Sequence, residues 1–397
     1  MKKTELINVK PPCKYYGRCG GCQLQHLANE SQDQVKQQTA EKYLGSFGKV
    51  EDILVMDYPY EYRNKITYSF GYAKKKELIA GMYAEYSHTI IDIDKCLIQD
   101  PIADQIIQTI KQIMRKYKME PYEEDRETGF LRHVLIRTGF ATGEVMVVLV
   151  AAHPIFTGKK NFIKLLTKAH PEITTIILNI NNKDTSMILG EKETTIYGKG
   201  YIEDILCGLK FRISTKSFYQ INPKQAEVLY NTALKMADFQ GNERILDAYS
   251  GIGTIALIAA KQVKEVIGVE LNPDGVKDAI KNAQTNEVDN VYFNEDDAGE
   301  FMGKLAKDNQ VIDAVIMDPP RSGSDEAFLS ALCSLKPQKI IYISCNPETQ
   351  ARDLTYLVDH GYSVRKIQPV DMFPQTNHVE TCVLLSHKNS QASSPSL

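Results

Sequence analysis

The stretch of the chain that decides its fold reads Arg244-Ile245-Leu246-Asp247-Ala248-Tyr249-Ser250-Gly251-Ile252-Gly253-Thr254. Its apolar start predicts a buried strand, and the residues after Gly253 predict a helix. Between them, two glycines let the backbone turn tightly and approach a ligand closely. The start of a helix also offers N–H groups that lack intrahelical partners. The spacing is G-x-G, so the turn matches neither the longer dinucleotide fingerprint nor a P-loop.

Outward from this turn, strands and helices alternate regularly along the C-terminal half. Further strands are predicted at 266–270, 291–293, 312–317, 339–344, 363–370 and 381–386, and helices at 253–261 and 274–285. Such alternation predicts a mostly parallel sheet covered by helices on both faces, which is the α/β class. We place this domain at 206–387 and expect the Ser-rich segment 388–397 to be a disordered tail.

The N-terminal half has a different pattern. Residues 67–72 and 145–150 predict strands, whereas residues 30–44 and 102–119 predict helices. We therefore expect an α+β domain at 1–205, beginning with a loop rich in cysteine and glycine. Four thiolates suit either a zinc ion or an iron–sulfur cluster, and the four cysteines in this half are Cys13, Cys19, Cys22 and Cys96.

Composition limits the class of protein and its surroundings. The chain has 397 residues and a formal net charge of −3, so any site for a polyanion must be a local patch. It contains no run of about 18 apolar residues that would indicate a membrane span, and its first residues lack the apolar core of a signal peptide. Eight cysteines in a chain of this length do not suggest a disulfide scaffold. We expect a monomeric cytoplasmic protein without membrane contacts.

Acidic residues follow three of the predicted strands: Glu270, Asp297 and Asp318. In an open α/β sheet, ligands bind at the carboxyl ends of the strands, and an acid after the second strand suits a ribose with two free hydroxyls. With the G-x-G turn, these acids resemble the S-adenosylmethionine (SAM) site of Rossmann-like methyltransferases. That resemblance implies that Glu270 binds the ribose and Asp297 the adenine side. A helix cap is the alternative role for Asp297.

A cysteine and a carboxylate are expected at the same rim of the sheet. The apolar strand 340–343 delivers Cys345 to a proline-enforced turn, and Glu380 opens another strand. A thiolate that adds to C6 of a uracil makes C5 nucleophilic, and a base must then remove the C5 proton before the thiol leaves. Methylation of an amino group needs no thiol, and in such enzymes an aromatic residue stands where this chain has Arg321. The alternative is that Cys345 is only a buried apolar cysteine.

Several motifs resemble the RNA 5-methyluridine methyltransferase family, and the resemblance covers nearly the whole chain. The motifs are Ser217–Asn222, Asp318–Arg321, Ser344–Pro347 with Ala351–Leu354, and His378–Glu380. The resemblance implies that Cys345 is the nucleophile and Glu380 the proton acceptor. It implies that the aromatic ring of Phe218 lies near a flipped base. It also implies SAM contacts from Gln220, Tyr249, Thr254, Glu270, Asp297 and Asp318.

The same resemblance implies that the four cysteines hold a [4Fe–4S] cluster, which orders the RNA-binding half of the chain. The compact Cys-Gly-Gly-Cys loop is similar to that of the branch acting on ribosomal RNA, so the expected substrate is a uridine of 23S rRNA. A tRNA uridine is one alternative. A non-catalytic iron–sulfur RNA-binding protein is another.

Contacts to RNA are expected from the central region. Members of the family often carry an OB-like (TRAM) domain ahead of the cysteines, and only residues 1–12 precede Cys13, so we expect that domain to be missing. Basic side chains must then supply more of the grip on RNA. The candidates are Arg63 and Arg132, with His133 and Arg137 beside them.

Overall fold

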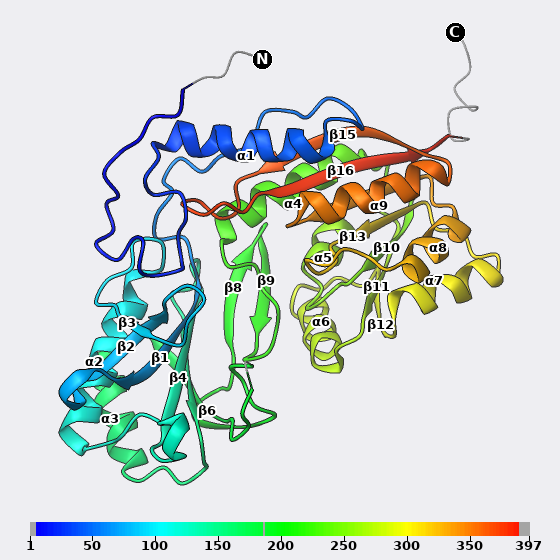
Figure 1. The fold of residues 1–397 in the computed structure, drawn as a ribbon. Coiled ribbons are helices and arrows are strands. Elements are labelled where there is room, and N and C mark those ends of the chain that lie inside the picture. Colours follow the sequence, from blue (N-terminus) through cyan, green and yellow to red (C-terminus); the bar gives the residue numbers. More distant parts are fainter. Residues whose placement is uncertain (1–4, 186, 389–397) are drawn as a thin grey trace.

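The computed structural model describes residues 5–185 and 187–388, and it builds them into two seven-stranded sheets and a two-stranded hairpin (Figure 1). Apart from Lys388, the predicted tail lies outside the described residues. No helix in the described part of the chain is long and apolar enough to cross a membrane.

The first sheet has the strand order β3-β2-β1-β4-β5-β6-β7 and forms the lower left part of Figure 1. Neighbouring strands are antiparallel except β5 and β6, which run parallel and are joined through a helix. Two helices, α2 and α3, pack on one face, and the hairpin β8–β9 packs on the other. The central strands β4 and β5 are buried along their whole length because both faces are covered. The bounds are β1 (Lys65–Tyr72), β2 (Leu78–Tyr83), β3 (Ile90–Asp92), α2 (Pro101–Tyr117), β4 (Leu131–Thr138), β5 (Val145–Ala151), α3 (Lys159–Ala169), β6 (Ile173–Ile180), β7 (Lys192–Gly198), β8 (Ile202–Leu206) and β9 (Leu209–Ile213).

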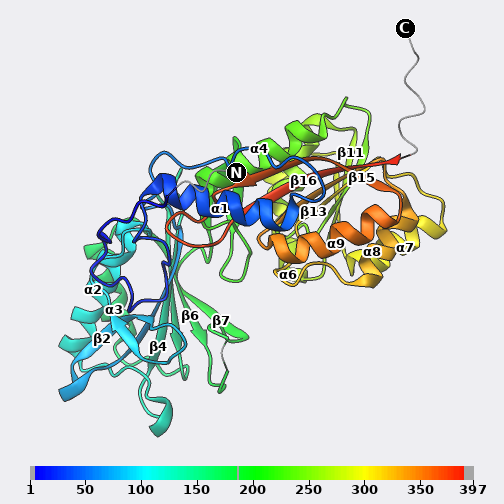
Figure 2. The same cartoon turned by 45° about the horizontal axis from the view of Figure 1, so that its top comes forward.

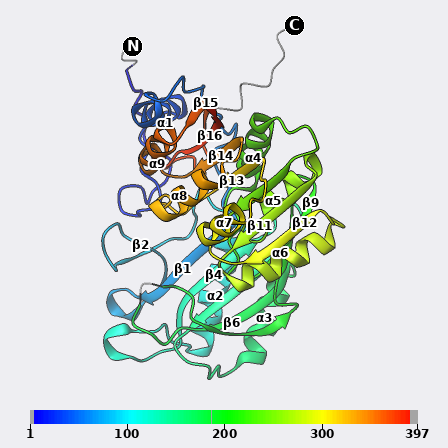
Figure 3. The same cartoon turned by 90° about the vertical axis from the view of Figure 1, so that its right-hand side faces the viewer.

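The second sheet has the order β12-β11-β10-β13-β14-β16-β15. Pairing is parallel from β12 to β14, as the alternating pattern predicts. Helices α4, α5 and α6 share a core with one face of this sheet, and α7, α8 and α9 with the other. Figure 3 views the molecule from this side. The bounds are α4 (Pro223–Ala237), β10 (Arg244–Ala248), α5 (Thr254–Ala259), β11 (Glu265–Glu270), α6 (Pro273–Thr285), β12 (Val291–Glu295), α7 (Ala298–Lys307), β13 (Ala314–Met317), α8 (Glu326–Leu335), β14 (Lys339–Ser344), α9 (Pro347–Asp359), β15 (Tyr362–Val370) and β16 (Glu380–His387).

The last strand, β16, runs antiparallel between β14 and β15, which the alternating pattern does not predict. In the pairing with β14, Ser344 lies opposite Thr381. The start of β16 therefore lies at the edge where β14 ends. This reversal brings Glu380, the first residue of β16, to the same rim as Cys345.

The N-terminal helix α1 (Asn29–Leu44) lies along the second sheet rather than the first, as Figures 1 and 2 both show. Its last residue, Leu44, belongs to the core beneath α9 and β15. The segment that follows forms bridges from Val50 to Ile367 and from Leu54 to Val370. The division predicted between residues 205 and 206 falls inside β8, whose apolar side chains share a core with both sheets.

Candidate active site

The rim at the carboxyl ends of the second sheet gathers most of the predicted site residues. Strands β10, β11, β13 and β14 are parallel, so Tyr249, Glu270, Asp318 and Cys345 leave the sheet at one edge. Glu380 joins them because β16 enters the sheet there. This is the edge at which open α/β sheets bind ligands.

The G-x-G turn is tied to the acid at the end of β11. The Glu270 carboxylate accepts hydrogen bonds from Gly251 N at 2.9 Å and from Asn272 N at 2.8 Å. Gly253 has a φ of +81°, and a Cβ there would lie 2.6 Å from the Phe293 ring. A side chain at that position would clash with this ring, so glycine lets the turn pack closely against β12.

Tyr249, Thr254 and Gln220 surround the same turn. The Tyr249 ring stacks on Phe328 with centroids 5.2 Å apart, and Thr254 is the first residue of α5. Gln220 is buried, and its backbone carbonyl accepts a hydrogen bond from Asn64 Nδ2 at 3.0 Å. This contact draws the loop before α4 toward the first sheet.

Asp297 caps a helix, which is the alternative role that the sequence predicts for it. It is the N-cap of α7, and its Oδ1 accepts a hydrogen bond from Glu300 N at 3.0 Å. Such a cap stabilises the helix whether or not a ligand is bound. A contact from Asp297 to adenine stays a prediction.

Asp247 is a site residue to which the sequence argument assigned no role. It is 1% exposed, and neither carboxylate oxygen has a hydrogen bond of ordinary geometry among the described residues, although the backbone N–H of Ala256 is close enough to lower its pKa. Burial, with Asp318 and Glu270 nearby, raises the pKa of Asp247 well above its usual range. Burying an acid is costly, so Asp247 beneath the G-x-G turn is an additional candidate for a ligand contact. The available signal was an acid at the end of an apolar strand directly before the turn.

Cys345 and Glu380 lie in one electrostatic group with Asp318 and Arg321. Burial first, then the nearby Glu380 and Asp318 carboxyls, raise the pKa of the Cys345 thiol to about 11, whereas Arg321 acts against them. The Arg321 carbonyl accepts a hydrogen bond from Asn346 Nδ2 at 3.1 Å, which ties this cation to the cysteine turn. The sequence argument used Arg321 to exclude amino-group methylation and as part of a family motif, and it assigned this residue no role toward the thiol.

The two carboxyls of this group have raised pKa values. Glu380 is 3% exposed, and its Oε2 has no hydrogen-bond partner among the described residues. Burial first, and then Asp318, raise the pKa of Glu380 well above its usual range, and Arg321 lowers it. Burial also raises the pKa of Asp318 to about 7. A carboxyl with a raised pKa is suited to exchanging protons near neutral pH.

Phe218 lies exposed on a loop that is itself firmly held. Its side chain is 66% exposed, as expected for a residue that meets a substrate base. Arg137, only 3% exposed, donates from Nη2 to the carbonyls of Thr215 and Ser217. Arg137 therefore supports this loop and is not available to RNA.

The other two basic candidates differ from each other. Arg132 is 6% exposed, forms an ion pair with Glu124, and donates to the carbonyls of Asn181 and Lys183, each at 2.9 Å. Its guanidinium is buried against these protein groups, so Arg132 is not positioned for the predicted contact with RNA. Arg63 is half-buried and its Nε has no partner among the described residues.

The four N-terminal cysteines come together, as the sequence analysis predicts. Cys13, Cys19, Cys22 and Cys96 all line one cavity of about 20 Å³, and none of them forms a disulfide. Burial is the largest cause of the raised pKa values of two of these thiols, about 11 for Cys22 and about 12 for Cys96. In the described ranges, no group of three or more histidine, cysteine or acidic side chains has the arrangement for a metal ion. The thiols surround a shared space, and the structure itself shows no metal site.

A parallel sheet with a G-x-G turn, and with an acid fixed beside that turn, is the architecture of a Rossmann-like methyltransferase. The family model for tRNA (uracil-5-)-methyltransferase matches residues 28–388. The chain belongs to this family and is a SAM-dependent RNA uracil-C5 methyltransferase.

Relatives and solved structures agree with this assignment. An uncharacterized RNA methyltransferase of Halalkalibacterium halodurans is 42% identical over 394 residues, covering 98% of this chain and 86% of the relative. A second, from Clostridium tetani, is 42% identical over 383 residues, covering 96% and 83%. The tRNA (uracil-54, C5)-methyltransferase of Pyrococcus abyssi, solved with S-adenosyl-L-homocysteine, has a TM-score of 0.77 and 29% identity, covering 93% of this chain and 86% of that one.

Proposed function

We propose that this enzyme methylates C5 of a specific uridine in 23S rRNA through a covalent adduct between Cys345 and C6 of the uracil. One observation supports this mechanism: four side chains lie close enough at one rim of the sheet to influence one another electrostatically. They are Cys345, Glu380, Asp318 and Arg321. C5 of an unmodified uracil is a weak nucleophile. An enzyme thiol and a base on one rim are the pair that carbon methylation requires.

The first step forms the bond between Cys345 Sγ and C6, and the electrons of the C5–C6 double bond move toward C5 and the O4 carbonyl. Only the thiolate attacks, so the S–H bond of Cys345 breaks first and its proton leaves to solvent, and Arg321 is the cation that favours the thiolate. Bound SAM supplies the methyl group to C5. Because C5 and C6 must both reach the rim, the base has to leave its stack, and the exposed Phe218 offers a ring for it to meet.

The second step restores the ring. Glu380 accepts the C5 proton, the electrons of that C–H bond re-form the C5–C6 double bond, and the bond from C6 to Sγ breaks. Breaking this bond regenerates the Cys345 thiolate. Burial and Asp318 raise the pKa of Glu380, which strengthens it as a proton acceptor once it is ionised.

SAM contacts are proposed from the residues around the turn. Glu270 is oriented by two backbone N–H groups toward the position of a ribose. Gln220, Tyr249, Thr254, Asp297 and Asp318 surround the rest of the cofactor, with Asp247 buried below the turn.

A [4Fe–4S] cluster held by Cys13, Cys19, Cys22 and Cys96 is proposed because four thiols line one cavity. Thiolates are the ligands of such clusters. The cluster would tie residue 96 to the N-terminal loop and have no part in methyl transfer.

The ribosomal substrate rests on the compact cysteine loop, and tRNA is a second candidate because the similar Pyrococcus abyssi enzyme acts on a tRNA uracil. Mapping 5-methyluridine by mass spectrometry in rRNA and tRNA of a deletion strain tests both. We expect one 5-methyluridine to disappear from 23S rRNA and to return with the wild-type gene but not with Cys345→Ala. Loss from tRNA alone would favour the second candidate.

A further inference from the structure

The connection between β15 and β16, residues 371–379, determines where Glu380 stands. It contains no helix or strand. It leaves the sheet at Val370 and returns at Glu380, and these two residues pair across the strands. Asp371 is therefore the next residue after the cross-strand partner of Glu380. A shift of Asp371 would therefore move the end of β15, and Glu380 pairs with that end.

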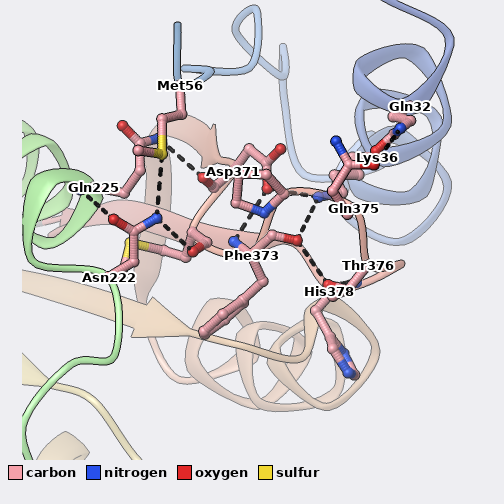
Figure 4. Close-up of polar contacts among 12 residues, drawn as sticks. Gln32, Lys36, Met56, Asn222, Gln225, Asp371, Phe373, Gln375, Thr376 and His378 are labelled. Atoms are coloured by element: carbon pink, nitrogen blue, oxygen red, sulfur yellow. Dashed lines mark hydrogen bonds and ion pairs between the residues drawn. The ribbon is translucent and has the colours of Figure 1, made fainter. Parts of the chain in front are cut away.

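A buried lysine from α1 holds this connection, as Figure 4 shows. Lys36 has a side chain that is 0% exposed, and its Nζ lies 2.5 Å from Asp371 Oδ1 and 3.0 Å from the Phe373 carbonyl. The same Asp371 oxygen accepts a hydrogen bond from Phe373 N at 3.1 Å. The Phe373 carbonyl also accepts one from Thr376 Oγ1 at 2.7 Å. Thr376 Oγ1 in turn accepts one from His378 N at 3.3 Å, two residues before Glu380.

Partners from other parts of the chain fix the remaining backbone of the connection. The Met372 carbonyl accepts a hydrogen bond from Asn222 Nδ2 at 3.0 Å, and the Asp371 carbonyl accepts one from Gln225 Nε2 at 2.9 Å. The Gln375 carbonyl accepts from the backbone N–H groups of Gln23 and Leu24, beside the cysteine loop. The Pro374 carbonyl accepts one from the Tyr62 hydroxyl at 2.9 Å. These amide and hydroxyl partners are neutral, so among the described residues Lys36 is the one that brings a full positive charge to a hydrogen bond of the connection.

That charge is costly. Burial lowers the pKa of Lys36 and raises that of Asp371, which means that desolvation outweighs their mutual attraction. Well-packed apolar residues in place of a buried ion pair are often as stable or more stable. A buried ion pair is therefore weak evidence for a role in stability, and the observation that carries the argument is geometric: the pair makes directional contacts to the connection beside Glu380.

We propose that Lys36, paired with Asp371, is a positioning residue for Glu380 and sets the geometry in which Glu380 removes the C5 proton. The inference rests on the proposed role of Glu380 as the base. Lys36 does not touch substrate. It acts by fixing the connection from which Glu380 projects.

The test replaces the pair by apolar residues in the double variant Lys36→Met/Asp371→Leu, which leaves no unpaired buried charge. Single-turnover reactions with 23S rRNA and radiolabelled SAM measure methyl transfer and release of the covalent protein–RNA complex separately. We expect release to slow by about ten- to hundredfold, because small misplacements of a catalytic group have effects of this size. The covalent complex should accumulate, while SAM affinity, KM for RNA and the urea midpoint stay near wild type. The control is Lys111→Met, which removes another buried lysine, paired with Asp92 at 2.6 Å, remote from the rim.

Release at the wild-type rate in a folded double variant would overturn the proposal. If circular dichroism shows that this variant is unfolded, Lys36→Gln/Asp371→Asn replaces it, and the same two outcomes decide. Glu380→Gln is measured in parallel. If Glu380→Gln itself fails to trap the complex, the proposed base is wrong. If it traps the complex and the double variant does not, only the role of Lys36 is wrong.

Discussion

Glu380 combines a buried carboxyl with an oxygen that has no partner in the described part of the chain, next to the thiol turn. We expect Glu380→Gln to transfer the methyl group and then stall, because the C5 proton has no acceptor. Turnover should fall by about 10²- to 10⁴-fold, the usual contribution of a positioned base. A denaturant-stable protein–RNA band on gels measures the stalled complex. The matched control is Glu326→Gln, an exposed acid of α8. Wild-type turnover in Glu380→Gln would remove Glu380 from the mechanism.

The Cys345 thiol should show its raised pKa directly. With a pKa of about 11, the thiolate fraction rises with pH throughout the neutral range. We therefore expect alkylation of Cys345 by iodoacetamide to speed up about tenfold per pH unit between about pH 7 and 9, read by peptide mass spectrometry. Arg321→Gln should slow alkylation at each pH because it removes the cation that favours the thiolate.

Cys333 is the internal control for this measurement. Burial alone raises its pKa to about 11, so Arg321→Gln should leave its alkylation unchanged. A rate at Cys345 that does not change with pH would contradict the assigned environment.

At the scale of elements, two residues of the Phe218 loop region have different roles: Phe218 is placed to bind RNA, and Arg137 stabilises the fold. Phe218 is 66% exposed, whereas Arg137 beneath it is buried against the Thr215 and Ser217 carbonyls. We expect Phe218→Ala to weaken RNA binding by about 1–3 kcal/mol, the usual contribution of a stacked base, without lowering the free energy of unfolding. Arg137→Met should lower that free energy by about 1–3 kcal/mol because it leaves buried carbonyls unsatisfied. Filter binding and urea unfolding measure the two effects.

Tyr86→Ala is the control for the Phe218 prediction, since Tyr86 is 99% exposed and lies in a loop of the first sheet between β2 and β3. It should change neither RNA affinity nor stability. An equal loss of RNA affinity in both variants would mean that Phe218 has no special place in the interface.

The elements also show which features of the fold can be predicted from the sequence alone. The alternation around residues 244–344 predicts the parallel strands because each strand and helix has its own apolar period. The antiparallel entry of β16 could not be predicted, since strand order depends on long-range pairing. The partners of basic residues could not be predicted either. The sequence suggests that Arg132 and Arg137 contact RNA, whereas in the structure both donate hydrogen bonds to backbone carbonyls of the protein. The link from Lys36 to Asp371 joins residues separated by 335 positions and has no local signal.

At the scale of the whole molecule, the four-cysteine cavity should decide whether the N-terminal half is ordered. We expect anaerobically purified protein to contain roughly four irons per chain and to absorb broadly in the visible range, as this type of cluster does. Cys22→Ser should lose RNA affinity more than SAM affinity, because the proposed SAM residues other than Gln220 lie on the second sheet and its helices. Cys333→Ser, outside the cavity, is the control. Stoichiometric zinc without iron would contradict the cluster.

The central claim is that Cys345 bonds to the target uracil, and 5-fluorouridine tests it most directly. Fluorine at C5 cannot leave as a proton, so the complex should stall after methyl transfer. We predict that 23S rRNA transcribed with 5-fluorouridine, incubated with SAM and enzyme, gives a covalent product whose nucleotide adduct maps by mass spectrometry to the Cys345 peptide. Cys345→Ala should give none. An adduct of undiminished yield in Cys345→Ala, or one that maps to another residue, would contradict the account.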